Sequence, residues 1–164
     1  MEKKNLYIDF DGVILDTITP LYEGIEKNKL KTSEERRVFI ANYPWQNIIN
    51  DEHIIANAME CIQKIIDSEK FNLAILTHIN SLNEGILKTK YLRKYFKDIT
   101  IILCPKEISK TKMVHSKDSI LVDDYAGNLR EWEKEEGISV RFSQKGNSKG
   151  YKVIKKLDEI IDMF

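Results

Sequence analysis

The sequence predicts an α/β fold in which a parallel sheet lies between layers of helices. Several short runs of apolar residues are nearly continuous rather than alternating with polar ones, which is typical of strands buried on both faces. Between these runs lie longer segments whose apolar residues recur at helical spacing. This alternation of strand and helix indicates a Rossmann-like parallel sheet of about five strands flanked by helices.

The individual elements follow from the position of each pattern along the chain. The expected strands are residues 6–10, 72–77, 100–104, 119–122 and 138–142. The expected helices are residues 54–66, 82–96, 129–135 and 151–163. In the helix expected over residues 54–66, for example, Ile54, Ala58, Cys61, Ile62 and Ile65 fall on one helical face.

The interval between the first and second expected strands is too long for a single crossover helix, which needs roughly 12 to 20 residues. We therefore expect residues 17–50 to form a small helical cap, inserted after strand one into a core made of residues 1–16 and 51–164. Residues 20–29 and 33–43 are the expected cap helices. Ser33 is the expected N-cap of the second, where Arg36 excludes a full capping box.

Composition and charge restrict the kind of protein. The chain has 164 residues, 26 basic and 26 acidic side chains and a formal net charge of +0 at pH 7. Proteins that wrap nucleic acids usually carry a basic excess, so we expect no stable nucleic-acid partner. No apolar signal or spanning segment is found, and Cys61 and Cys104 lack zinc-binding spacing. We expect buried free thiols, no membrane association and a cytoplasmic location.

Two pairs of carboxylates occur at the ends of expected strands. Asp9 and Asp11 end the first strand just before Gly12, and Asp123 and Asp124 end the fourth. In open parallel sheets, ligands bind at the carboxyl ends of the strands, so we expect the two pairs to converge. Four carboxylates repel one another without a divalent cation, and Mg²⁺ prefers oxygen ligands and usually shares its shell with a phosphate. Taken alone, each pair also fits ordinary capping of a turn or helix.

A hydroxyl and several lysines complete this pattern. Thr77 ends the second expected strand, and Lys106, Lys110 and Lys112 precede the fourth. Both residue types suit phosphate oxygens, although a strand-end Thr and a solvated Lys-rich loop are equally ordinary explanations. His78 either lines the site or belongs to the following loop. The basic residues of the run 88–97, like Arg36 and Arg37, are expected to be solvated helix faces.

Taken together, these motifs resemble the haloacid dehalogenase (HAD) superfamily of phosphatases over nearly the whole chain. The first motif of that family, Asp-x-Asp-x-[Val/Thr], is matched by Asp9-Phe10-Asp11-Gly12-Val13. Thr77 matches the second motif, Lys110 or Lys112 the third, and Asp123-Asp124 the fourth. Within the superfamily, Ile120-Leu121-Val122-Asp123-Asp124-Tyr125 followed by Asn128, Trp132 and Gly137 resembles the 5'(3')-deoxyribonucleotidase branch.

The resemblance implies a HAD-like core and a hydrolase of phosphoric monoesters that acts on nucleoside monophosphates. It implies that Asp9 is the nucleophile that forms an aspartyl-phosphate, and that Asp11 is the general acid and then the base. The implied cofactor is Mg²⁺. The implied metal ligands are Asp9, Asp11 through its backbone carbonyl, and Asp124, with Asp123 in support, and the implied phosphate-binding residues are Thr77 and Lys110.

Other functions remain open. One is a HAD phosphatase of a sugar phosphate or of the 3'-phosphate of a polynucleotide. Another is a non-enzymatic phosphoacceptor resembling a signalling receiver domain, although there the paired acids follow the first strand. A degenerate binding module has no support, since every expected catalytic position is filled. Tyr43 and Trp45, in the expected cap, either stack on a nucleobase or anchor the cap to the core.

Overall fold

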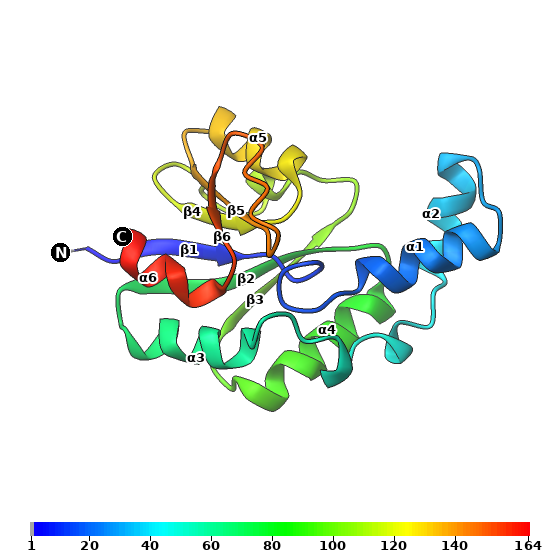
Figure 1. The fold of residues 1–164 in the computed structure, drawn as a ribbon, viewed down its shortest axis with the longest axis horizontal. Coiled ribbons are helices and arrows are strands. Elements are labelled where there is room, and N and C mark those ends of the chain that lie inside the picture. Colours follow the sequence, from blue (N-terminus) through cyan, green and yellow to red (C-terminus); the bar gives the residue numbers. More distant parts are fainter. Residues whose placement is uncertain (1) are drawn as a thin grey trace.

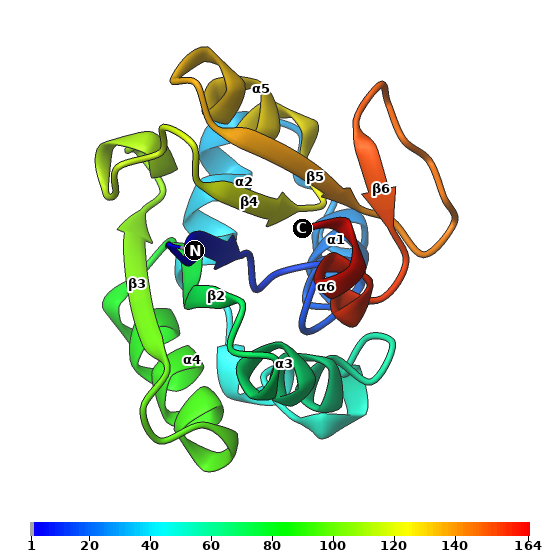
Figure 2. The same cartoon turned by 90° about the vertical axis from the view of Figure 1, so that its left-hand side faces the viewer.

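The computed structural model describes residues 2–164. Its centre is a 6-stranded sheet in the order β3-β2-β1-β4-β5-β6, in which all neighbouring strands are parallel (Figures 1 and 2). The strands are β1 Lys4–Ile8, β2 Phe71–Ile79, β3 Thr100–Pro105, β4 Ile120–Asp123, β5 Ile138–Phe142 and β6 Lys152–Ile154. The strand order reverses between β1 and β4, which is where ligands bind in such sheets. The predicted α/β fold class is confirmed.

Helices cover both faces of the sheet. The helices beside it are α3 Ala58–Asp67, α4 Leu82–Tyr95, α5 Ala126–Lys134 and α6 Ile160–Met163. Figures 1 and 2 show α5 on one face and α3, α4 and α6 on the other. Each face has its own apolar core: Leu121 packs with Trp132 of α5 on one side, and Ile8 packs with Ile62 of α3 on the other. Burial on both faces explains why these strands are continuously apolar.

Two helices lie apart from these layers, beyond the carboxyl end of β1 (Figure 1). They are α1 Ile18–Lys27 and α2 Ser33–Ala41, followed by the short 3₁₀ helices η1 Trp45–Asn47 and η2 Asp51–His53. The predicted division into a core of residues 1–16 and 51–164 and a cap of residues 17–50 stays a prediction. Within the part of the chain that the structure describes, no helix combines the length and apolarity needed to cross a membrane.

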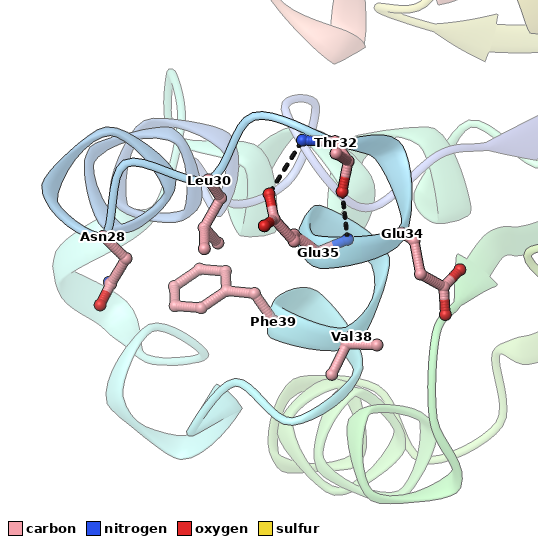
Figure 3. Close-up of a pocket in the computed structure, with 7 residues that line it drawn as sticks. All are labelled: Asn28, Leu30, Thr32, Glu34, Glu35, Val38 and Phe39. Atoms are coloured by element: carbon pink, nitrogen blue, oxygen red, sulfur yellow. Dashed lines mark hydrogen bonds between the residues drawn. The ribbon is translucent and has the colours of Figure 1, made fainter.

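The capping of α2 differs from the prediction. The N-cap is Thr32 rather than Ser33, and the capping box is complete because Glu35, not Arg36, is the third helical residue. The Glu35 amide donates to Thr32 Oγ1 at 3.1 Å and the Thr32 amide donates to Glu35 Oε2 at 3.0 Å (Figure 3). Two orphan amides at the helix start are thereby satisfied.

The expected helix over residues 151–163 is also wrong. Lys152–Ile154 pairs with β5 as a sixth strand, and helical turns begin only at η4, Leu157–Glu159, before α6. The β-branched residues Val153 and Ile154 favour the strand, and Ile154 is buried in the main core. Only the second half of the helical pattern therefore forms a helix.

Trp45 packs the segment that follows α2 into the main apolar core. Its side chain is 1% exposed, belongs to the main apolar core, and donates from Nε1 to the carbonyl oxygen of Ile40 at 3.1 Å. A ring buried to this extent has no free face for a nucleobase. Of the two interpretations of Trp45, the anchoring one is confirmed and the stacking one is wrong.

Candidate active site

The turn after β1 places Asp9 and Asp11 at the carboxyl edge of the sheet. The Asp9 amide donates to the carbonyl oxygen of Val122 at 2.9 Å, which continues the pairing of β1 with β4. Gly12 then adopts a φ of +74°, a conformation that glycine reaches without strain. A Cβ atom on Gly12 would lie 2.3 Å from Asp124 Oδ2, so glycine also makes room for that carboxylate.

Asp123 ends β4, fully buried, and both of its carboxylate oxygens accept hydrogen bonds. Oδ1 accepts from the Tyr125 amide at 2.9 Å. Oδ2 accepts from Asn128 Nδ2 at 2.9 Å and from Lys110 Nζ at 2.7 Å. Asp123 is therefore a fixed anchor for Lys110, and the adjacent Asp124 is the carboxylate turned toward Gly12.

Asp9, Asp123 and Asp124 form a compact acidic cluster. Each offers a carboxylate oxygen, and these oxygens lie within 4.8 Å of one another. Burial, together with the charge of Asp123, raises the pKa of Asp9 to about 7. Burial, together with the charges of Asp9 and Asp123, raises the pKa of Asp124 to about 8. The raised pKa values mean that negative charge on these carboxylates is unfavourable in the absence of a cation. A hard divalent cation such as Mg²⁺, which prefers oxygen ligands, would offset this charge.

Lys110 lies in a 3₁₀ helix, η3 Lys110–Lys112, and its ammonium reaches into this cluster. Nζ is 2.8 Å from Asp9 Oδ1 and 2.7 Å from Asp123 Oδ2. Burial disfavours the ammonium, yet Asp123 and Asp9 raise its pKa above the usual value. Lys106 and Lys112 are exposed, so of the candidate lysines the structure brings Lys110 to the carboxylates.

The Asp11 carboxylate faces a different set of groups. Oδ1 accepts from Thr17 Oγ1 at 2.7 Å, and Oδ2 accepts from Lys88 Nζ at 2.6 Å. Both oxygens of this carboxylate therefore have a donor partner. The Asp11 side chain does not belong to the acidic cluster, so its predicted metal contact concerns only its backbone carbonyl, as the sequence resemblance implied.

Lys88, like Thr17, is a residue of the site that the sequence interpretation missed. It was expected on a solvated helix face, but its side chain is 0% exposed. Burial disfavours its ammonium, while Asp11 and Glu84 raise its pKa above the usual value. One signal was available: Glu84, Lys88 and Leu92 are four residues apart, so they share the helix face that carries the apolar Leu92.

Thr77 and His78 lie beside Lys88 near the carboxyl end of β2, which continues to Ile79, two residues beyond the predicted end at Thr77. The buried Thr77 hydroxyl accepts from Lys88 Nζ at 3.0 Å and donates to the His78 carbonyl oxygen at 3.2 Å. The His78 ring donates from Nε2 to the Ile108 carbonyl oxygen at 2.9 Å, and burial lowers its pKa. His78 thus ties β2 to the loop after β3, as expected of a strand-end residue.

A separate pocket of about 440 Å³ lies in the region of α1 and α2 (Figure 3). Its lining is mainly apolar, and it includes Leu30, Val38 and Phe39. None of the residues that line this pocket belongs to the acidic cluster or is hydrogen-bonded to Lys88 or Lys110. We therefore place the candidate active site at the acidic cluster rather than in this pocket.

The arrangement of the strands is shared with known structures. A hydrolase from Pseudomonas syringae has a TM-score of 0.65 and 12% identity, over 97% of this chain and 96% of that one. A haloacid dehalogenase-like family hydrolase from Streptococcus pneumoniae has a TM-score of 0.64 and 10% identity, over 99% and 98%. The chain has the HAD-like fold. No protein-family model and no curated protein sequence matches it.

A third similar structure is a D,D-heptose 1,7-bisphosphate phosphatase from B. bronchiseptica, which was crystallised with magnesium and phosphate. Its TM-score is 0.58 at 11% identity, over 97% of both chains. At such identities the likeness extends to the fold alone. These similar structures therefore support the predicted fold. The inferences about chemistry depend on the residues of this chain described above.

The raised pKa values predict how stability depends on pH and metal. Without metal, Asp9 and Asp124 hold protons in the folded state that the unfolded chain releases near its ordinary pKa of about 4. The contribution of these two groups to the stability of the metal-free protein should therefore fall as pH rises from about 4 through 8. Mg²⁺ at about 100 times its Kd should stabilise by about 2.7 kcal/mol, and so raise Tm by about 5–10 °C.

Thermal unfolding with Mg²⁺ or with a chelator, at about pH 6 and pH 8, measures this effect. The Mg²⁺ shift should be larger at the higher pH, because protons then compete less with the metal. Asp124→Asn should abolish the shift. The exposed control Asp118→Asn, at a φ of 58° that Asn tolerates, should keep it. An Mg²⁺ shift that survives Asp124→Asn would contradict the metal assignment.

Proposed function

We propose that this protein is a Mg²⁺-dependent phosphomonoesterase that acts through an aspartyl-phosphate on Asp9. The observation that carries the proposal is the position of the Asp9 carboxylate. It lies in the acidic cluster with Asp123 and Asp124, and its Oδ1 is 2.8 Å from the ammonium of Lys110. A carboxylate placed between a cation site and a lysine suits attack on a phosphate, whose negative charge both groups offset.

The residues of the site fit Mg²⁺, and each has a distinct role. Asp9 and Asp124, with the backbone carbonyl of Asp11, would hold the ion, and Asp123 would support them by fixing Lys110. When bound, the ion supplies positive charge that offsets the charge on the phosphoryl oxygens. Lys110 donates two hydrogen bonds to Asp9 and Asp123, so one of its three N–H groups is left for a phosphate oxygen.

The reaction proceeds in two displacements. In the first, an oxygen of Asp9 attacks phosphorus, the bond to the ester oxygen breaks, and Asp11 gives a proton to that leaving oxygen. In the second, water attacks the same phosphorus, Asp11 takes a proton from the water, and the bond to Asp9 breaks to release phosphate. Lys110 stabilises the transferring group by hydrogen bonding. The proposed contribution of Thr77 requires its one O–H, which donates to the His78 carbonyl oxygen in this structure, to turn toward the phosphate.

For the substrate we propose a nucleoside monophosphate, with a sugar phosphate as the alternative. The nucleoside monophosphate rests on the sequence resemblance over residues 120–137. Three of the residues that carry it have packing roles: Asn128 holds Asp123, Trp132 donates to the Ser119 carbonyl oxygen, and Gly137 lies against the Trp132 ring. Tyr125, next to Asp124, is 62% exposed and offers an aromatic face to a base. The sugar phosphate is suggested by the heptose bisphosphate phosphatases among the similar structures.

A substrate panel tests the proposed function. Phosphate release is measured from 5'- and 3'-monophosphates of ribo- and deoxyribonucleosides and from sugar phosphates, with Mg²⁺ or with a chelator. We expect Mg²⁺-dependent release, highest for the nucleoside monophosphates. A preference for sugar phosphates would select the alternative substrate, and no release from any phosphomonoester would contradict the proposed function.

Lys110→Met should lower kcat/KM by about 10²–10³-fold, the usual cost of losing one donor to a developing charge. The matched control is Lys112→Met, which changes an exposed lysine in the same 3₁₀ helix and should leave the rate unchanged. Steady-state kinetics on both variants, with thermal unfolding as a check of the fold, make the comparison. Equal losses in the two variants would be incompatible with a specific role for Lys110.

A further inference from the structure

Lys88 is a buried cation for which the proposed reaction has no role. Its ammonium lies near four acceptors: Asp11 Oδ2 at 2.6 Å, Glu84 Oε1 at 2.8 Å, and Thr77 Oγ1 and the His78 carbonyl oxygen at 3.0 Å each. The side chains of Lys88 and Glu84 are both 0% exposed. A buried charge of this kind destabilises the fold unless hydrogen-bond partners compensate it. Lys88 and its four acceptors therefore have to stay in contact.

The number of contacts separates Lys88 from a substrate-binding lysine. An ammonium has three N–H donors, and four acceptors already surround that of Lys88. Lys110, by contrast, has two side-chain acceptors, Asp9 and Asp123. Lys88 therefore has no donor to spare for a phosphate, and its effect on a reaction has to pass through the groups it already holds.

Of the three side chains that accept from Lys88, only that of Asp11 reaches solvent, since Thr77 and Glu84 are fully buried. The Asp11 side chain is 19% exposed. Its Oδ1 accepts a hydrogen bond from Thr17 and its Oδ2 accepts one from Lys88. Lys88 is itself held by Glu84, which accepts from the amide and side chain of Asn80. This chain of contacts fixes the Asp11 carboxylate relative to α4 and the end of β2.

The aromatic rings around Lys88 strengthen this arrangement. Its Nζ lies 5.1 Å from the centroid of the Phe10 ring and 5.4 Å from that of Trp45. These rings keep water away from the ammonium and attract it, which strengthens its pairing with Asp11. The rotation of the Asp11 side chain is thus restricted by a dry and fully paired cation.

We propose that Lys88 is a positioning residue that fixes the orientation of the Asp11 carboxylate for proton transfer to and from the reacting oxygens. This inference rests on the proposed phosphatase function, in which Asp11 serves the leaving group. It adds that the effect of Lys88 on the rate depends on how much the leaving group needs a proton. An alkyl ester needs a proton on its leaving oxygen, whereas a p-nitrophenyl ester leaves as a stable phenolate and needs little help.

Lys88→Met should therefore act selectively. We expect the rate of Asp9 phosphorylation to fall by about 10²-fold with an alkyl phosphate. With p-nitrophenyl phosphate it should stay within about threefold of wild type. Single-turnover kinetics with both esters measure this step. The control Lys90→Met, at an exposed position of the same helix, should match wild type with both.

Two further variants keep the test decisive. E84Q/K88M removes both buried charges, so it avoids leaving Glu84 without its cation, and it should show the same selective loss. In the D11N background, K88M should cost no further activity toward the alkyl ester, since Lys88 acts through Asp11. Equal losses with both esters, no loss with either, or additive losses in D11N would each overturn the inference. A wild-type protein inactive on both esters would instead contradict the proposed function.

Discussion

Asp9→Asn is expected to abolish turnover, with kcat lowered by about 10⁴-fold or more. The substitution keeps the size of the side chain but replaces the attacking carboxylate with a weakly nucleophilic amide. The neighbouring Asp123 is not free to substitute for it, because its two oxygens are held by Tyr125, Asn128 and Lys110. Measurement of kcat at saturating Mg²⁺ tests the expectation, and a near-normal rate would rule out Asp9 as the nucleophile.

The same variant should fold. Burial raises the pKa of Asp9 to about 7, which means that its charge is unfavourable in the folded, metal-free protein. Removing that charge should leave the Tm of the metal-free protein unchanged or higher near pH 8, while Lys110 keeps its pair with Asp123. Asp98→Asn, at an exposed position, is the matched control and should retain full activity. A loss of activity in Asp9→Asn therefore reports on chemistry.

Asp11→Asn is expected to have the second largest effect, a loss of about 10²–10⁴-fold in kcat. Asparagine cannot give or take the proton at the reacting oxygen. Mg²⁺ affinity should change little, because the Asp11 carboxylate contacts Thr17 and Lys88 and does not join the acidic cluster. The turnover rate and the Mg²⁺ dissociation constant, measured on the same preparation, test this separation.

Equal losses of rate and of metal affinity in Asp11→Asn would contradict the separate roles of the two carboxylates. The comparison with Asp124→Asn sharpens the test, since Asp124 belongs to the acidic cluster. Its substitution should weaken Mg²⁺ binding strongly. The two variants together therefore distinguish a residue that handles protons from one that holds the ion.

The convergence of the acidic residues was predictable from sequence because it depends on topology. Asp9 directly follows β1 and Asp123 ends β4, and these strands are parallel neighbours, so their ends meet at one edge of the sheet. Spacing alone left Lys110 and Lys112 as alternatives. A 3₁₀ turn points them in different directions, and only the structure shows that Lys110 is the buried one.

Lys88 was not predictable in the same way. Its partner Asp11 is 77 residues away in sequence, and a basic run in a helix is usually solvated. The sixth strand was missed because three residues, Lys152–Ile154, form too short a pattern beside a longer helical one. The N-cap of α2 was misplaced by one residue, since Thr32 and Ser33 are both capping residues and only the structure shows that Glu35 completes the capping box of Thr32.

Detection of a phosphoryl group on Asp9 is the most direct test of the proposed mechanism. Asp11→Asn is mixed with p-nitrophenyl phosphate and Mg²⁺, because this ester needs little acid catalysis and the variant lacks the base for hydrolysis. The reaction is quenched in acid and the peptides are analysed by mass spectrometry. We expect a phosphorylated peptide containing Asp9, which is missing when Mg²⁺ is chelated or when Asp9 is also changed to Asn. Turnover of phosphomonoesters by the wild-type protein, with phosphate never found on Asp9 or found on another residue, would contradict the mechanism.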